Sequence, residues 1–110
     1  MSQRIEKINE LLRQKLSELI LKEIEFPANA LITITKAKTS PDLKYAKIFI
    51  TVLPDNQRGT VLEILRKNSH HLHKILQKQL VTKFTPNLNF LIDEQEIFAS
   101  EVDKLLDEIK

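Results

Sequence analysis

Apolar residues recur at a spacing of three and four along the first part of the chain. Positions such as Ile5, Leu12 and Leu19 fall on one side of a helix over residues 3–25. Pro27 ends this pattern, because the residue before a proline is disfavoured in helical geometry. The pattern predicts an amphipathic helix packed on a core. A helix lying on a membrane surface is the alternative, but the polar side carries equal numbers of acidic and basic residues, which favours the core helix.

Two stretches then alternate between apolar and other residues, which is the pattern of β-strands. The first covers residues 31–38 and the second residues 43–53. Residues 39–42, Thr-Ser-Pro-Asp, are typical of a turn, and so short a link makes the two strands antiparallel. We expect the second strand, the longer and more apolar of the two, to lie in the centre of the sheet.

The helical spacing returns over residues 60–80, but polar residues interrupt it in the middle. Position 68 falls on the apolar side of an unbroken helix, yet it is an asparagine, followed by Ser69 and two histidines. Side chains of Asn and Ser accept hydrogen bonds from the free N–H groups at the start of a helix. The sequence therefore predicts two helices, with a break at Asn68 and Ser69 and a cap from their side chains.

A third alternating stretch, residues 88–92, follows the helix pair, and helical spacing over residues 93–110 predicts a last, acidic helix. A crossover through two helices makes the second and third strands parallel. This order gives an α+β fold, α-β-β-α-α-β with a C-terminal helix, in which a three-stranded mixed sheet has helices on one face. It is the type II KH arrangement, and we expect residues 1–110 to form one KH-like domain. Ordinary KH domains clamp nucleic acid with a GXXG loop, which a chain with the single glycine Gly59 cannot form.

Charge is distributed unevenly along the chain, although the net charge is only +2. Residues 36–83 contain ten Lys and Arg against three acidic residues, whereas residues 93–110 contain two basic and seven acidic residues. The basic excess in the middle suggests a polyanionic partner. A solvated surface with scattered lysines is the alternative that composition leaves open.

Several classes of protein are disfavoured by what the chain lacks. It has no cysteine, which removes disulfides, thiolate nucleophiles and zinc–cysteine sites. No stretch approaches the length of an apolar membrane span, so we expect a cytosolic protein without a membrane partner. Three neighbouring histidines lack further zinc ligands, and paired carboxylates of the last helix are solvated. We therefore expect no metal, no cofactor and no enzymatic activity.

Three short segments are more specific than the periodicity. They are residues 32–43 (ITITKAKTSPDL), residues 45–50 (YAKIFI) and residues 86–90 (PNLNF), the last closing on Asp93. In this order they resemble the ribosome-binding factor A family, bacterial factors of small-subunit assembly, over about residues 3–106. The resemblance implies binding to the free 30S subunit and its 16S rRNA, non-catalytic help in maturing the 5′ region of that RNA, and a role in the cold.

The resemblance also implies a KH-like fold in which a kink built on Ala-x-Gly replaces the GXXG loop. Asn68, Ser69 and His70 stand at the kink positions of this chain, so both the alanine and the glycine are absent. These residues either contact RNA or only cap a helix. Asn tolerates the left-handed backbone that a kink uses, so we still expect a break.

Lys and Arg position RNA through its phosphates without reading sequence. We expect the lysines of the hairpin and of the helix pair to form one basic cluster along RNA in a monomeric protein. The candidate RNA-binding residues are Lys36, Lys38, Lys44, Lys47, Arg66, Lys67, Asn68, Ser69, His70, His71, His73, Lys74, Lys78 and Lys83. The alternative function is a protein-interaction module that uses the acidic last helix or the sheet edge and does not contact RNA.

Overall fold

The computed structural model of the protein describes residues 2–80 and 85–95. The elements follow in the order α1 (Ser2–Glu23), β1 (Leu31–Thr39), β2 (Tyr45–Leu53), the short 3₁₀-helix η1 (Asp55–Gln57), α2 (Arg58–Lys67), α3 (Ser69–Gln79) and β3 (Asn87–Ile92). The predicted order of helices and strands is confirmed over this part of the chain, and η1 was not predicted. The last helix, predicted over residues 93–110, lies outside the described residues beyond Gln95.

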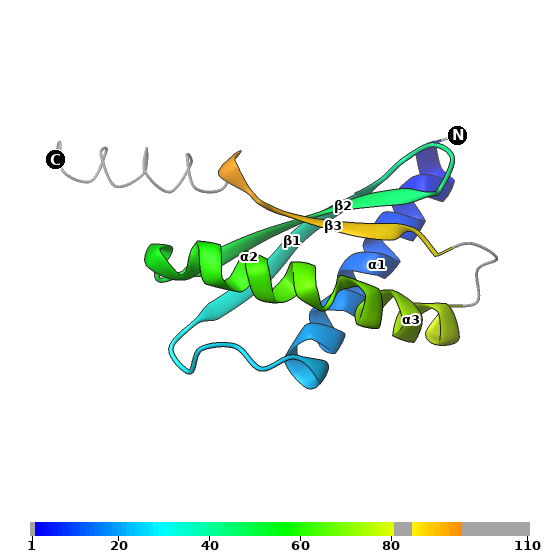
Figure 1. The fold of residues 1–110 in the computed structure, drawn as a ribbon. Helices are drawn as coiled ribbons and strands as arrows, with labels where there is room; N and C mark the ends of the chain where they lie inside the picture. The colour runs from blue at the N-terminus through cyan, green and yellow to red at the C-terminus, as the bar shows by residue number, and fades with distance from the viewer. Residues whose placement is uncertain (1, 81–84, 96–110) are drawn as a thin grey trace, which may run out of the picture.

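The three strands form one mixed sheet with β2 in the centre, as the sequence predicts (Figure 1). β1 pairs with β2 in antiparallel orientation, and β3 pairs with β2 in parallel orientation. Alternation along β2 turns Ala46, Ile48, Ile50 and Val52 to one face, where all four are buried. α1 packs on this face against β1, and α2 and α3 pack on it against β3. We call the opposite face of the sheet the outer face.

The core lies between this sheet and the helices. α1 contributes Leu12, Leu16 and Ile20, each at most 1% exposed. The helix pair contributes Val61, Leu65, Leu72 and Leu76, and β3 contributes Phe90; all five are fully buried. Burying side chains of this size stabilises the fold by about 1.5–3 kcal/mol each relative to exposure. The predicted apolar sides of the helices are therefore the ones that meet the sheet.

A β-bulge at Thr35 decides which way the lysines of β1 point. Strict alternation from the buried Ile34 would turn residue 36 toward the core as well. The register with β2 shifts between Ile34 and Lys36, and the next buried residue is Ala37. The bulge adds one residue to the strand, so Lys36 and Lys38 lie on the outer face instead of in the core.

Thr35 also ties the bulge to the end of β3. Its hydroxyl lies 2.6 Å from Oδ2 of Asp93 and 3.2 Å from the carbonyl oxygen of Phe49. A hydroxyl donates only one hydrogen. The Asp93 carboxylate is nearer than the Phe49 carbonyl and is the stronger acceptor, so the hydroxyl donates to Asp93. Asp93 is only 3% exposed, and its N–H donates to the carbonyl oxygen of Ile50 at 2.8 Å. These bonds hold the end of β3 in place across the whole sheet.

The turn between β1 and β2 is longer than the sequence predicts, because β2 begins at Tyr45 rather than at residue 43. Leu43 N–H donates to the carbonyl oxygen of Ser40 at 2.9 Å, and Leu43 has a φ of 63°, in the left-handed region. Asp42 accepts hydrogen bonds from the Ser40 hydroxyl (2.6 Å) and the Lys44 N–H (3.1 Å). These two bonds, chiefly the one from Ser40, hold the pKa of Asp42 below its ordinary value.

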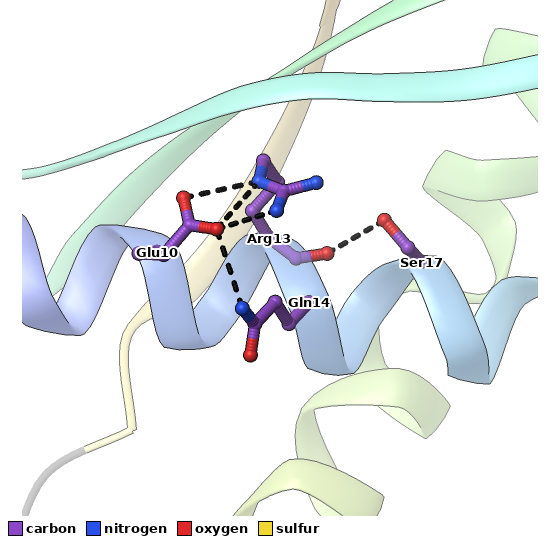
Figure 2. Close-up of polar contacts among 4 residues, drawn as sticks. All are labelled: Glu10, Arg13, Gln14 and Ser17. Atoms are coloured by element: carbon purple, nitrogen blue, oxygen red, sulfur yellow. Dashed lines mark hydrogen bonds and ion pairs between the residues drawn. The ribbon is translucent and has the colours of Figure 1, made fainter.

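Polar side chains on α1 bond to one another and to the helix backbone around Arg13, as Figure 2 shows. Glu10 accepts hydrogen bonds from the guanidinium of Arg13 and from Nε2 of Gln14. The bond from Arg13 lowers the pKa of Glu10 and raises that of Arg13. Ser17 donates its hydroxyl hydrogen to the carbonyl oxygen of Arg13 at 2.7 Å. The basic charge of Arg13 is therefore balanced within α1.

Candidate nucleic-acid interface

The break between α2 and α3 falls at Asn68, as predicted, but the capping prediction is wrong. No side-chain hydrogen bond from Asn68 caps the start of α3, and its φ of −98° lies outside the left-handed region. Instead, Nδ2 of Asn68 donates to the carbonyl oxygen of Ile64 at 2.8 Å. The hydroxyl of Ser69 donates to the carbonyl oxygen of Arg66 at 2.9 Å. The last carbonyls of a helix lack partners within the helix. Both side chains therefore complete the end of α2 rather than the start of α3.

A single residue separates the two helices, so they run end to end across the sheet (Figure 1). Their buried residues form one continuous row, and their solvent sides consequently form one continuous surface. We call this the helix-pair surface. Its exposed candidate residues are Arg66, Lys67, His70, His71, Lys74 and Lys78.

The lysines of the helix-pair surface differ in their partners. Nζ of Lys67 lies 3.2 Å from Oε1 of Glu63, but both side chains are about two-thirds exposed or more, at 73% and 68%. An exposed pair of this kind contributes about 0–1 kcal/mol, so it gives way easily to another anion. Over residues 2–80 and 85–95, Lys74 and Lys78 have no ion pair within 4.0 Å. Their charge is available to a polyanion.

Two further candidate residues of the helix pair bond to backbone carbonyls outside the pair. Nη2 of Arg66 donates to the carbonyl oxygen of Phe90 at 3.3 Å. Nε2 of His73 lies 2.9 Å from the carbonyl oxygen of Thr85, which can only accept, so this nitrogen carries the hydrogen. Both contacts fasten the helix pair to β3 and the segment before it. No local pattern in the sequence indicates them, because each joins residues far apart in the chain.

The hairpin lysines do not join the helix-pair surface. Lys36, Lys38 and Lys47 lie on the outer face of the sheet, and Lys44 lies in the turn beside it. The helices cover the other face, so the two groups of lysines are separated by the sheet and the core. The expectation of one basic cluster is therefore wrong. For Lys36 and Lys38 the physical reason is the bulge at Thr35, which turns both side chains to the outer face. Lys83 lies outside the described residues.

The outer face is built from rows that cross the three strands. Lys38 of β1 lies opposite Lys47 of β2, which in turn pairs with Asn89 of β3. The next row consists of Lys36, Phe49 and Leu91. The three strands contain no Asp or Glu, so their charge is entirely positive.

A hollow of about 530 Å³ lies beside this last row and the end of β3. Lys36, Phe49 and Arg66 are among its lining residues, and so are the acidic residues Asp93 and Glu94. Because its charges are mixed, the hollow favours a phosphate less than the helix-pair surface does. The described residues contain no group of three or more metal-ligating side chains. None of the described helices has the length and apolar character to cross a membrane.

The sequence is similar to one family of known proteins. Residues 4–106 match the family model of ribosome-binding factor A. A ribosome-binding factor A of Thermodesulfovibrio yellowstonii is 36% identical over 107 residues, covering 97% of this chain and 91% of the relative.

A crystal structure and a fitted homology model are among those that share the fold. The crystal structure of ribosome-binding factor A from Thermus thermophilus has a TM-score of 0.67 at 18% identity, covering 78% of this chain and 91% of that one. A homology model of the Thermus thermophilus factor, fitted into the cryo-EM map of its 30S complex, has a TM-score of 0.65 at 22% identity. It covers 76% of this chain and 88% of that one.

Proposed function

The chain belongs to the ribosome-binding factor A family, and we propose that it binds the free 30S ribosomal subunit through its 16S rRNA. The Thermus thermophilus factor with the same fold has been fitted into a map of its complex with 30S. We propose that one KH-like domain carries this function and acts as a monomer in the cytoplasm, and the family match over residues 4–106 supports this.

The observation that carries the proposal is the continuous helix-pair surface with its exposed lysines. In KH domains the loop between paired helices clamps the nucleic-acid backbone. Here a one-residue break at Asn68 replaces the loop, and Lys67, Lys74 and Lys78 are exposed beside it. Ammonium groups contact phosphates without a glycine-rich loop, because the side chain reaches the anion and the backbone need not approach it.

The candidate residues divide into two roles in this proposal. Lys67, His70, His71, Lys74 and Lys78 contact RNA from the helix-pair surface. Lys83, which lies outside the described residues, is a further proposed RNA contact. Asn68, Ser69, Arg66 and His73 hold the shape of that surface through their bonds to backbone carbonyls. Lys36, Lys38, Lys44 and Lys47 make a separate set of phosphate contacts from the other side of the domain.

The mechanism is binding without catalysis. A ligand shifts a conformational equilibrium only by its different affinity for the two states. The domain therefore stabilises the form of the immature 16S rRNA whose phosphates fit its lysines, and assists maturation of the 5′ region in this way. RNA misfolds into long-lived alternatives most readily in the cold, where we propose this help matters most. No cofactor or metal takes part.

The dependence of binding on salt tests the proposal against a protein-interaction module that does not contact RNA. In a plot of the logarithm of the affinity against the logarithm of the salt concentration, each neutralised phosphate contributes a slope of about −0.7 to −0.9. The three lysines of the helix-pair surface alone predict a slope of about −2 to −3 for binding to purified 30S subunits, and contacts from the hairpin lysines make it steeper. A slope near zero would favour contact with ribosomal protein and contradict the proposal.

A further inference from the structure

Tyr45 is a largely exposed aromatic residue on the outer face of the sheet. It is the first residue of β2, its side chain is turned away from the core, and the residue is 62% exposed. Its backbone is fixed, because its N–H donates to Oγ of Ser40 at 3.1 Å and its carbonyl accepts from the Ser40 N–H at 2.8 Å. The ring therefore stands at the start of a strand whose backbone is held to Ser40 by two hydrogen bonds.

The other aromatic ring of this face, Phe49, is in a different state. Phe49 is half-buried, and Nζ of Lys36 lies 4.9 Å from the centroid of its ring. The same ammonium donates a hydrogen bond to Oε1 of Gln95 at 3.1 Å. A cation held at this distance from an aromatic ring is attracted to it. Phe49 already has its partner, and Tyr45 is the ring left for a ligand.

Positive charge stands beside the Tyr45 ring. Side chains two residues apart on a strand point the same way and are about 7 Å apart along it, which places Lys47 next to Tyr45. Lys47 lies directly opposite Lys38. Like charges facing each other across a sheet are destabilising, and the strands supply no acidic residue to offset them. The fold tolerates this repulsion, and an anion bound between the two lysines would relieve it.

An exposed ring beside paired cations fits an unpaired nucleotide. Bases of single-stranded RNA stack on aromatic side chains while Lys and Arg take the phosphates, whereas bases of a duplex are stacked on one another and hidden. Asn87, the register partner of Tyr45 on β3, is exposed beside the ring and offers an amide to a base edge.

We propose that the outer face binds a single-stranded RNA segment, with one base stacked on Tyr45 and the adjoining phosphates on Lys38 and Lys47. This inference rests on the proposed function in taking RNA as the partner. It adds a second contact, on the side of the domain opposite the helix-pair surface, that recognises unpaired nucleotides rather than backbone alone.

The chain provides its own reporter for this contact. Tyr45 is its only tyrosine and it has no tryptophan, so the intrinsic tyrosine fluorescence arises at this site alone. A short oligouridylate should quench this fluorescence in a saturable way, and an RNA duplex of matched charge should not. Inorganic polyphosphate, which binds lysines but has no base, should displace the oligonucleotide without quenching by itself. Equal quenching by single strand, duplex and polyphosphate would overturn the stacking proposal and leave only a site for anions.

Variants separate the ring from the charge. With a labelled oligouridylate, Tyr45→Ala should weaken binding by about 5- to 150-fold, the range that one base stacked on an aromatic side chain provides. Tyr45→Phe keeps the ring and should bind nearly as the wild type does. The double variant Lys38→Glu with Lys47→Glu should lose quenching, and the matched reversal of Lys7 and Lys22 on α1 should retain it. Wild-type affinity in Tyr45→Ala would refute the inference.

Failure of the outer-face site can be distinguished from failure of the proposed function. Reversing Lys67, Lys74 and Lys78 should leave the quenching by oligouridylate unchanged, because these lysines lie on the other side of the domain. If the wild type fails to bind 30S subunits but is still quenched by single strands, the proposed function fails and the outer-face site stands. If it binds subunits but Tyr45→Ala has no effect on single strands, only the outer-face site fails.

Discussion

The side-chain amide of Asn68 donates a hydrogen bond to the carbonyl oxygen of Ile64, 2.8 Å away and one helical turn earlier. This bond explains how two helices meet with one residue between them and without a glycine. Asn68 N–H also lies within hydrogen-bond distance of the Ile64 carbonyl, at 3.1 Å, and the Asn68 carbonyl accepts from the Leu72 N–H at 3.0 Å. The asparagine thus ends one helix with its side chain and begins the next with its backbone.

Substitutions at residue 68 test this arrangement. Asn68→Ala should lower the free energy of unfolding by about 1 kcal/mol, the net contribution of one such hydrogen bond. Asn68→Asp should cost at least as much, because a carboxylate cannot donate and is repelled by the Ile64 carbonyl. Asp is as good a cap as Asn at the start of a helix. If Asn68→Asp is as stable as the wild type in urea unfolding, relative to the exposed loop control Asn29→Asp, the side chain caps α3 after all.

The sequence allowed the helix pair and its break to be predicted because burial imposes a strong pattern. A polar residue at position 68 cannot continue the row from Leu65 to Leu72, so the interruption was visible. The direction of the Asn68 and Ser69 side chains was not. Both groups can cap either helix, and the choice depends on which backbone groups remain without partners once the two helices are placed on the sheet.

The distribution of lysines shows a second limit of prediction from sequence. The many lysines of the hairpin and the helix pair indicated a polyanionic partner. They did not indicate that the sheet separates the two groups of lysines. The deciding feature is one extra residue at Thr35, which turns Lys36 outward. The bulge depends on contacts of Thr35 with Phe49 and with Asp93, which lies 58 positions away in the chain. No local pattern of hydrophobic and polar residues contains that information.

Thr39 provides a stability test at the end of β1. It is 9% exposed, and its hydroxyl oxygen is buried with no hydrogen-bond partner among the described residues. An unsatisfied buried polar group costs about 1–3 kcal/mol. Thr39→Val removes the hydroxyl but keeps the shape, so it should raise the free energy of unfolding by about 1 kcal/mol. Thr33→Val, on the exposed outer face, is the control. A less stable Thr39→Val would mean that the hydroxyl makes a bond important to the fold.

The turn at Asp42 makes stability depend on pH in one direction. The folded state lowers the pKa of Asp42 below its ordinary value of 3.8, chiefly through the Ser40 hydroxyl. A lowered pKa in the folded state stabilises the fold above the ordinary value, and this contribution is lost as the pH falls through the folded value. The difference in melting temperature between the wild type and Asp42→Ala should therefore be full at neutral pH and shrink in acid.

Ser40→Ala is the control for the turn. This variant lacks the largest cause of the lowered pKa of Asp42. The difference in melting temperature between Ser40→Ala and Asp42→Ala should therefore change less with acid than the difference between the wild type and Asp42→Ala. A difference between wild type and Asp42→Ala that stays constant from neutral pH to well below 3.8 would show that the charge of Asp42 contributes nothing to the turn.

The most direct measurement is co-sedimentation of charge-reversed variants with purified 30S subunits. Changing Lys67, Lys74 and Lys78 together to Glu should abolish binding and leave the melting temperature nearly unchanged, since all three side chains are exposed. The same change in net charge on α1, at Arg4, Lys7 and Lys22, should leave binding intact. Full co-sedimentation of the helix-pair variant would contradict the claim that this surface binds the ribosomal subunit.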